Sequence, residues 1–234
     1  MSDIKSADFG ALYAQFQAPI SVLDCGEKCA PYNEYGAPFC CDTAHAIPTA
    51  YQPEWDYLQQ SSTDLWHLWD ADDPATTARL RAEISDGQVL IECRGLAYCQ
   101  RSFRSITCRA FPFFPYITRQ GEFIGLAYYW QYEDRCWMIS NLHTVTLEYR
   151  AQFIAVYDYI FEHIPQEVVN FRYYSTLMRR VFGRRKRSIP VLHRNGNVYK
   201  ITPRNGRMRR VSAESLSKFG LYKIAAMMPF PDEA

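Results

Sequence analysis

The chain of 234 residues can bury one large core or two small ones, and its composition, 48% hydrophobic and 15% aromatic, excludes an intrinsically disordered protein. No apolar run approaches the roughly 18 residues that cross a bilayer, so we expect no membrane helix and no membrane partner. The net charge of +1 is the sum of −10 over residues 1–100, −1 over residues 101–170 and +12 over residues 171–234.

The first third of the chain is predicted to be rich in loops, because five prolines interrupt residues 19–53. Pro53 begins a short predicted helix, PEWDYLQQ, and residues 62–70 are expected to continue as a helix up to the acidic run DADD. Asp73 is a predicted N-cap for a helix over 74–85, with Pro74 at its first position. Gly87 follows that helix, and QVLIEC at 88–93 is typical of a strand.

The middle of the chain alternates between irregular and regular predicted structure. Residues 99–118 are interrupted by two prolines and are expected to lack regular structure, whereas residues 122–133 predict a strand with a kink at Gly125. Residues 144–164 have apolar side chains at helical spacing, and Pro165 ends that helix. A second helix is predicted over 167–183, with Gly183 just beyond its end.

The last part of the chain predicts a small β-meander. Residues 189–212 contain Asn-Gly at 195–196 and again at 205–206, each between strand-like runs. Asn-Gly suits the positive φ angles of a type I′ turn, so three strands are expected. A short helix is predicted near 213–226.

No catalytic motif stands out in the sequence. The five histidines share no spacing, and the sequence contains no P-loop, G-x-G-x-x-G, G-x-S-x-G or H-E-x-x-H. Helix capping accounts for the acidic run DADD at 70–73, which matches neither an EF-hand loop nor a catalytic carboxylate pair. The pattern favours a protein that is not an enzyme by itself and leaves catalysis open.

Eight cysteines are the main chemical signal. The segment 1–16 has two aspartates and lacks the basic and apolar regions of a signal peptide, so we expect a cytoplasmic protein. In a reducing cytosol, disulfides are rare and clustered thiols are more typical of metal sites. Disulfides and isolated buried cysteines remain alternatives, but neither explains an adjacent Cys-Cys pair well. The candidate metal ligands are Cys25, Cys29, Cys40, Cys41, Cys93, Cys99, Cys108 and Cys136.

The order of these cysteines resembles a known family. A C-x3-C pair, the pair Cys40–Cys41, then CRGLAYC at 93–99 and CRAFPF at 108–113 are similar to the YkgJ-like cysteine-cluster family of zinc- or iron-chelating proteins, whose early cluster is CxxCxxCC. The resemblance covers roughly residues 20–140. The chain departs from the family pattern in the ten residues between Cys29 and Cys40 and at Ser105, where the family has proline. The resemblance implies a metal site and by itself implies no activity.

Thiolates suit both zinc and iron–sulfur clusters. Seven cysteines match the family motifs, more than one zinc ion can use, and only His45 is close to the cysteines in sequence. We therefore favour an iron–sulfur cluster of the four-iron [4Fe-4S] type, with Cys136 as an additional candidate ligand. Zinc, and a division into two sites, remain open.

The basic C-terminal part is the second signal. Its cations are expected to meet an acidic protein surface, with nucleic acid or a simply solvated face as the alternatives. The candidate docking residues are Arg184, Arg185, Lys186, Arg187, Arg207, Arg209 and Arg210.

Together these features predict an α+β protein. Residues 1–170 are expected to form a loop-rich, metal-stabilised cysteine-cluster domain with packed helices, and residues 171–234 a basic helix, a β-meander and a terminal helix. The predicted function is iron–sulfur binding, for electron transfer or as a redox-sensitive structural site. One alternative is a zinc-stabilised module whose basic tail docks a protein or RNA. Another is an enzyme similar to the protein lysine N-methylases that share the cysteine domain.

Overall fold

Strands in the computed structural model, which describes residues 4–62 and 64–225, form two antiparallel sheets. The small sheet has the order β1-β3-β2, and the large sheet has the order β4-β5-β6-β7-β8. Their bounds are β1 Thr49–Tyr51, β2 Trp66–Leu68, β3 Gln88–Cys93, β4 Phe113–Ile117, β5 Phe123–Tyr128, β6 Ile189–His193, β7 Val198–Ile201 and β8 Met208–Val211.

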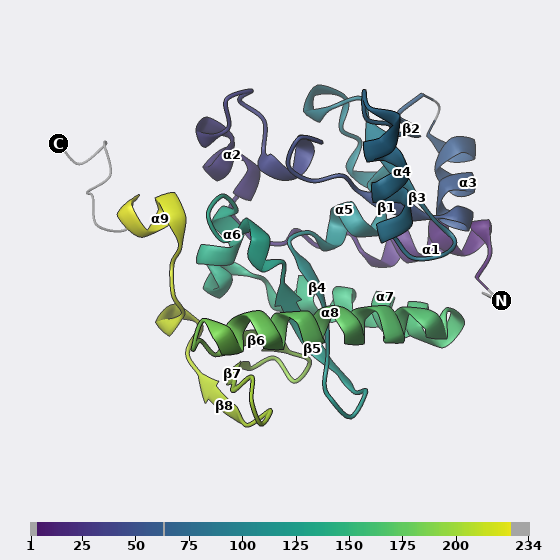
Figure 1. Ribbon diagram of the computed structural model, residues 1–234. Helices are drawn as coiled ribbons and strands as arrows, with labels where there is room; N and C mark the ends of the chain where they lie inside the picture. Colours follow the sequence, from purple (N-terminus) through teal and green to yellow (C-terminus); the bar gives the residue numbers. More distant parts are fainter. Residues whose placement is uncertain (1–3, 63, 226–234) are drawn as a thin grey trace.

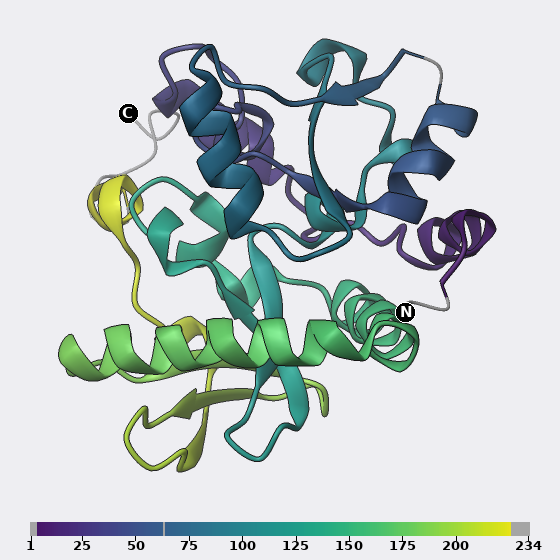
Figure 2. The ribbon, with the colours of Figure 1, turned by 45° about the vertical axis from the view of Figure 1, so that its right-hand side comes forward.

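The helices divide between the two sheets. The long helices α7 and α8 pack on each other, and α8 lies across the strands of the large sheet (Figures 1 and 2). The shorter helices α1, α3 and α4 lie around the small sheet in the same views, whereas α2 lies beside α6. The helix bounds are α1 Ser6–Gln15, α2 Cys25–Cys29, α3 Gln52–Ser61, α4 Pro74–Glu83, α5 Ile106–Ala110, α6 Trp137–Ser140, α7 Leu147–His163, α8 Pro165–Arg184 and α9 Gly220–Ala225.

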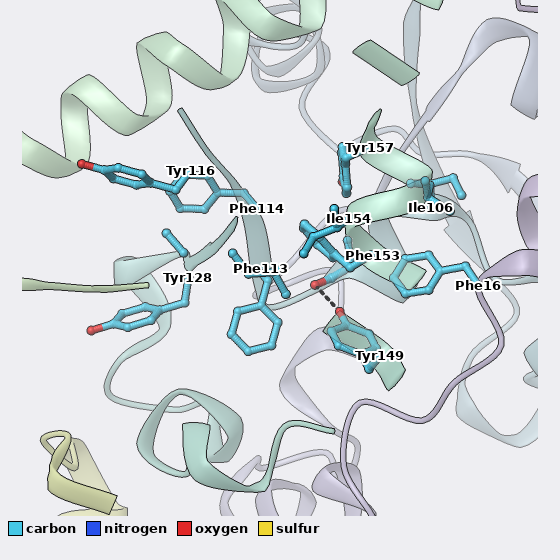
Figure 3. Packing of buried hydrophobic residues seen from close by; sticks show 14 of the residues in the cluster. Phe16, Ile106, Phe113, Phe114, Tyr116, Tyr128, Tyr149, Phe153, Ile154 and Tyr157 are labelled. Carbon is cyan, nitrogen blue, oxygen red and sulfur yellow. Dashed lines mark hydrogen bonds between the residues drawn. The ribbon is translucent and has the colours of Figure 1, made fainter. Parts of the chain in front are cut away.

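One hydrophobic core, rich in aromatic side chains, contains residues of both sheets. Phe113 and Phe114 of β4 and Tyr149 and Phe153 of α7 are almost completely buried (Figure 3). Burying each such ring contributes on the order of 1.5–3 kcal/mol. The Tyr149 hydroxyl lies 3.0 Å from the carbonyl oxygen of Ala110, so the core also fixes the end of the cysteine-bearing helix α5.

Several predicted elements are confirmed, and the chain is an α+β protein. Helix α4 begins at Pro74, and the Asp73 carboxylate accepts hydrogen bonds from the backbone N–H groups of Ala75 and Thr76. Strand β3 has the predicted bounds, α3 and α7 are present, and the meander forms β6 to β8. The described part of the chain contains no helix with both the length and the apolar character needed to cross a membrane.

Two predicted segments are wrong because long-range strand pairing overrides the local pattern. Residues 64–70 of the segment predicted as helix 62–70 are not helical: β2 pairs with β3, with Trp66 opposite Cys93. The proline-rich segment 99–118 contains α5 and β4 rather than irregular structure. Pro115 is tolerated in β4 because that strand is at the edge of the large sheet.

Element ends also differ from the predictions. Gly183 lies inside α8, and the left-handed residue beyond that helix is Lys186, with φ of 53°. The predicted strand 122–133 is shorter, since β5 ends at Tyr128 and a 3-10 turn follows. The segment predicted as a helix near 213–226 is a 3-10 turn followed by α9, and residue 226 lies outside the described residues.

The two Asn-Gly turns are not of type I′. Gly196 and Gly206 have positive φ angles, of 83° and 74°, but the asparagines before them do not. Instead, the side-chain oxygen of Asn195 accepts a hydrogen bond from the backbone two residues later, at 3.1 Å. Asn205 does the same at 3.0 Å. These asparagines stabilise the turns as Asx motifs, and glycine alone supplies the left-handed position.

The large sheet combines distant parts of the sequence. Strand β5 pairs with β6, with Gly125 opposite His193 and Leu126 opposite Leu192. Residue 170, the predicted domain boundary, lies within α8. The sheet therefore takes strands from both sides of that boundary.

Candidate functional site

Five of the eight cysteines line one cavity of about 470 Å³. They come from separate elements: a 3-10 turn that ends at Cys41, the end of β3, the loop after β3, and helix α5. Because the five thiols come from four backbone segments, the fold and not the local sequence brings them together. The cavity cysteines are Cys40, Cys41, Cys93, Cys99 and Cys108.

A buried arginine shapes the loop that carries two of these cysteines. The Arg109 guanidinium donates to the carbonyl oxygens of Arg104, at 2.8 Å, and of Ser102, at 2.8 Å. It also donates to the carbonyl oxygen of Phe16, at 2.5 Å, and lies over the ring of Tyr13. These contacts fix the loop from Cys99 to Cys108 against the N-terminal segment. Nothing in the sequence around Arg109 indicated this role.

Two local backbone features shape the segments that line the cavity, a helix cap at Ser105 and a glycine turn at Gly95. The Ser105 hydroxyl accepts from the backbone N–H of Cys108, at 3.2 Å, and so begins helix α5. Gly95, with φ of 95°, provides the turn after β3 that a residue with a side chain would adopt only with strain. The Ser105 side chain thus supplies the N-cap of α5.

The remaining three cysteines are outside the lining of this cavity but close to it. Besides burial, the charge of Cys41 raises the pKa of Cys29. Cys25 and Cys29 lie on α2, and Cys136 directly precedes α6. Burial first, and then the neighbouring thiols of Cys25 and Cys29, raise the pKa of Cys136. Cys29 packs in a small apolar cluster with Tyr222 of α9.

The thiols influence one another's ionisation. A hydrogen bond between Cys40 and Cys41 raises the pKa of Cys40 and lowers that of Cys41 to about 7. Burial raises the pKa of Cys108 to about 12, with further increases from Cys41, Cys99 and Cys93. A cation in this cavity would therefore favour the thiolate forms.

Arg104 is the cation closest to the sulfur atoms. Its Nε donates to Cys99 Sγ at 3.2 Å. Burial alone would lower the pKa of Arg104, but its attraction to the thiolate forms of Cys108 and Cys99 raises it above its usual range. The side chain therefore remains charged and can stabilise negative charge on the cavity sulfurs.

Thiol sulfur atoms are the candidate metal donors of this cavity. All eight cysteines are free thiols. Over residues 4–62 and 64–225, no three Cys, His, Asp or Glu side chains are arranged so as to hold a metal ion directly. Each thiol has three staggered χ1 positions, so rotation about one bond can turn a sulfur atom toward or away from the cavity.

A second cavity, of about 710 Å³, adjoins the first. Cys40 and Cys108 line both cavities. The second cavity is rich in aromatic side chains and also contains the buried carboxylate of Glu167, which accepts from the Tyr51 hydroxyl at 2.8 Å and from the Asn170 amide at 2.7 Å. Two thiols can thus be approached from two sides.

The predicted docking residues do not gather at one place. Arg185 and Arg187 form ion pairs with Glu133, at 3.4 and 2.7 Å, and Arg187 also lies over the rings of Phe182 and Phe219. Arg187 is therefore partly buried and held by internal contacts, whereas the Arg185 side chain is 47% exposed. The other candidate docking residues are exposed: Arg184, Lys186, Arg207, Arg209 and Arg210.

Comparison with known proteins gives no match: no family model, no curated protein and no solved structure is similar to this chain. The resemblance to the YkgJ-like family therefore depends on the cysteine motifs alone.

Proposed function

We propose that the five-cysteine cavity binds an iron–sulfur cluster and that the protein acts as a redox centre. The observation that carries the proposal is the convergence of five thiols from four backbone segments on one cavity, with a charged arginine on one of the sulfurs. A four-iron cluster uses four cysteine thiolates. The cavity supplies that number with one to spare.

The surroundings of the cavity support a redox role rather than a purely structural one. Hydrogen bonds to the sulfurs and local charge set the reduction potential of such clusters, and Arg104 provides both. The adjoining aromatic cavity reaches Cys40 and Cys108 from the other side. A molecule bound there would lie within a short distance of the centre for electron exchange.

The proposal assigns different roles to the two cysteine groups. Cys41→Ala and Cys108→Ala are expected to lose the cluster and to lower the free energy of unfolding, because metal-binding free energy is also folding free energy. Cys136→Ala is the matched control, since Cys136 lies outside the cavity lining. It is expected to keep the cluster.

The experiment is anaerobic purification of the wild type and the three variants, followed by absorption spectra and iron, sulfide and zinc analysis. A brown protein that bleaches with dithionite, in the wild type and Cys136→Ala only, supports the proposal. A colourless wild type that contains stoichiometric zinc would contradict the iron–sulfur proposal and indicate a zinc site. If Cys136→Ala loses its iron and Cys41→Ala retains it, the ligands belong to the group of Cys25, Cys29 and Cys136 and not to the cavity.

A further inference from the structure

Five arginines surround a hollow of about 440 Å³ on the side of the large sheet, away from the cysteines. The hollow lies where α8 meets the loop between β4 and β5 and the turn between β7 and β8. None of its eight lining residues is acidic or aromatic. The arginines are Arg119, Arg172, Arg179, Arg180 and Arg204.

Neutral groups hold three of these side chains in place. The Arg179 side chain is buried and donates to the carbonyl oxygen of Ile117, at 2.9 Å, and to the Thr176 hydroxyl, at 2.7 Å. Arg119 donates to the carbonyl oxygen of Pro203 at 3.0 Å, and Arg172 donates to the carbonyl oxygen of Arg119 at 2.5 Å. These three guanidinium groups are positioned before any ligand binds, so binding need not order them.

Carboxylates do not balance these charges. None of the five arginines takes part in an ion pair in the described part of the chain. Elsewhere, arginines of the same C-terminal half do have acidic partners: Arg187 pairs with Glu133, and Arg194 pairs with Asp158. Five like charges around one hollow repel one another, and an anion in the hollow would relieve that repulsion.

We infer that this hollow is a binding site for a compact polyphosphate group. Guanidinium forks match the oxygens of phosphate, and several positive charges favour a ligand with several negative ones. The lining offers no aromatic ring on which a nucleobase could stack. The site therefore recognises the phosphates, whether they are inorganic or form the tail of a nucleotide.

Two exposed arginines allow a test that leaves the fold intact. Arg180 and Arg204 are solvent-exposed, so changing both to alanine should not affect folding. The matched control is Arg209→Ala with Arg210→Ala, which removes the same charge from exposed positions on β8 outside the hollow. Metal content and thermal unfolding of both double variants should equal those of the wild type, which separates this site from the proposed redox centre.

Binding is measured by titration calorimetry with tripolyphosphate, inorganic phosphate, ATP and a single-stranded RNA, all at one ionic strength. We expect tripolyphosphate to bind the wild type more tightly than phosphate does, and ATP to bind about as tightly as tripolyphosphate. The Arg180→Ala, Arg204→Ala variant loses two charged hydrogen-bond donors, so its affinity for tripolyphosphate should fall roughly 100-fold. The affinity of the control variant should fall less than about threefold.

Equal weakening in both double variants would overturn the site, because it would indicate a general basic surface. Equal affinity for phosphate and tripolyphosphate would also overturn it. A third outcome would also contradict the proposal: RNA could bind the wild type much more tightly than tripolyphosphate does, and this binding could disappear in both double variants. The ligand would then be an extended nucleic-acid backbone and not a compact polyphosphate.

Discussion

Glu54 is a fully buried carboxyl group that connects three parts of the chain. It accepts hydrogen bonds from the Tyr13 hydroxyl at 2.7 Å, from the backbone N–H of Ile106 at 2.6 Å and from the backbone N–H of Tyr51 at 3.2 Å. Burial nevertheless raises its pKa from 4.5 to about 7, since these donors offset only part of the lost hydration. The native state therefore holds a proton on Glu54 at pH values where the unfolded chain has released it.

This raised pKa predicts that the protein becomes less stable as the pH rises from 5 to 7. Because the native state binds more protons than the unfolded state in that window, the free energy of unfolding falls with pH, by up to roughly 3 kcal/mol. Glu54→Gln is expected to flatten this dependence, and the exposed control Glu122→Gln is expected to retain it. Urea unfolding at several pH values measures the slope; identical slopes in all three proteins would contradict the prediction.

Arg104 gives a second prediction at the residue scale, for the protein with its proposed cluster bound. Replacing Arg104 by glutamine removes the positive charge beside Cys99, and the reduced, more negative state loses more stabilisation than the oxidised state. The midpoint potential should fall by roughly 60 mV, which corresponds to a tenfold change in a one-electron equilibrium. Arg101→Gln is the control, since its side chain is 67% exposed. Redox titration gives both values, and a potential that is unchanged or higher in Arg104→Gln would count against the cluster position.

At the scale of elements, Gly220 determines how α9 docks beside the second cysteine group. It has φ of 53°, and a Cβ atom there would overlap the backbone carbonyl of Asp134. Tyr222 then reaches the carbonyl oxygen of Arg135 at 2.9 Å and covers Cys29. One glycine thus permits the close approach that places α9.

Gly220→Ala is expected to release α9 and expose Cys29. The control is Gly121→Ala, because Gly121 also has a positive φ, of 94°, but no atom lies within 4 Å of the added Cβ. Both variants carry backbone strain of order 1–3 kcal/mol, so only the overlap distinguishes them. The rate of Cys29 alkylation, read by mass spectrometry, should rise in Gly220→Ala and stay near the wild-type rate in Gly121→Ala. Equal rates in the two variants would show that the overlap is relieved without movement of α9.

The elements that sequence analysis predicted well are those with local signals. Helix α4 has its Asp-Pro start and α7 has its helical period and final proline. Strand β2 and strand β4 have no such signal, because pairing with β3 and β5 is what makes them strands. The same limit applies to the site: the eight cysteines were evident, but their division into five and three depends on tertiary packing. The five arginines of the hollow come from three separate segments, so no local pattern indicated them.

At the scale of the whole molecule, the cysteine-bearing part depends on the C-terminal strands. Strand β5 has β4 on one side and β6 on the other, and α8 packs against β4. A fragment of residues 1–170 would contain all eight cysteines but leave the edge of β5 unpaired and much of the core exposed. Such an edge is a site for aggregation.

We therefore expect fragment 1–170 to be insoluble, whereas fragment 1–211, which keeps β6 to β8 and lacks α9, should be soluble. Size-exclusion chromatography of both fragments beside the full chain distinguishes the outcomes. A monomeric, folded fragment 1–170 would instead show that the predicted division at residue 170 separates two independent domains.

The pairing of β5 with β6 also affects the protein during its synthesis. About 60 residues separate Tyr128 from Ile189, and a ribosome that adds roughly 5–20 residues per second needs roughly 3–12 s to produce them. All eight thiols leave the ribosome before the strand that completes their support exists. The nascent chain therefore presents reduced cysteines beside an open strand edge for seconds, which is the interval in which a chaperone or a metal-delivery factor would have to act.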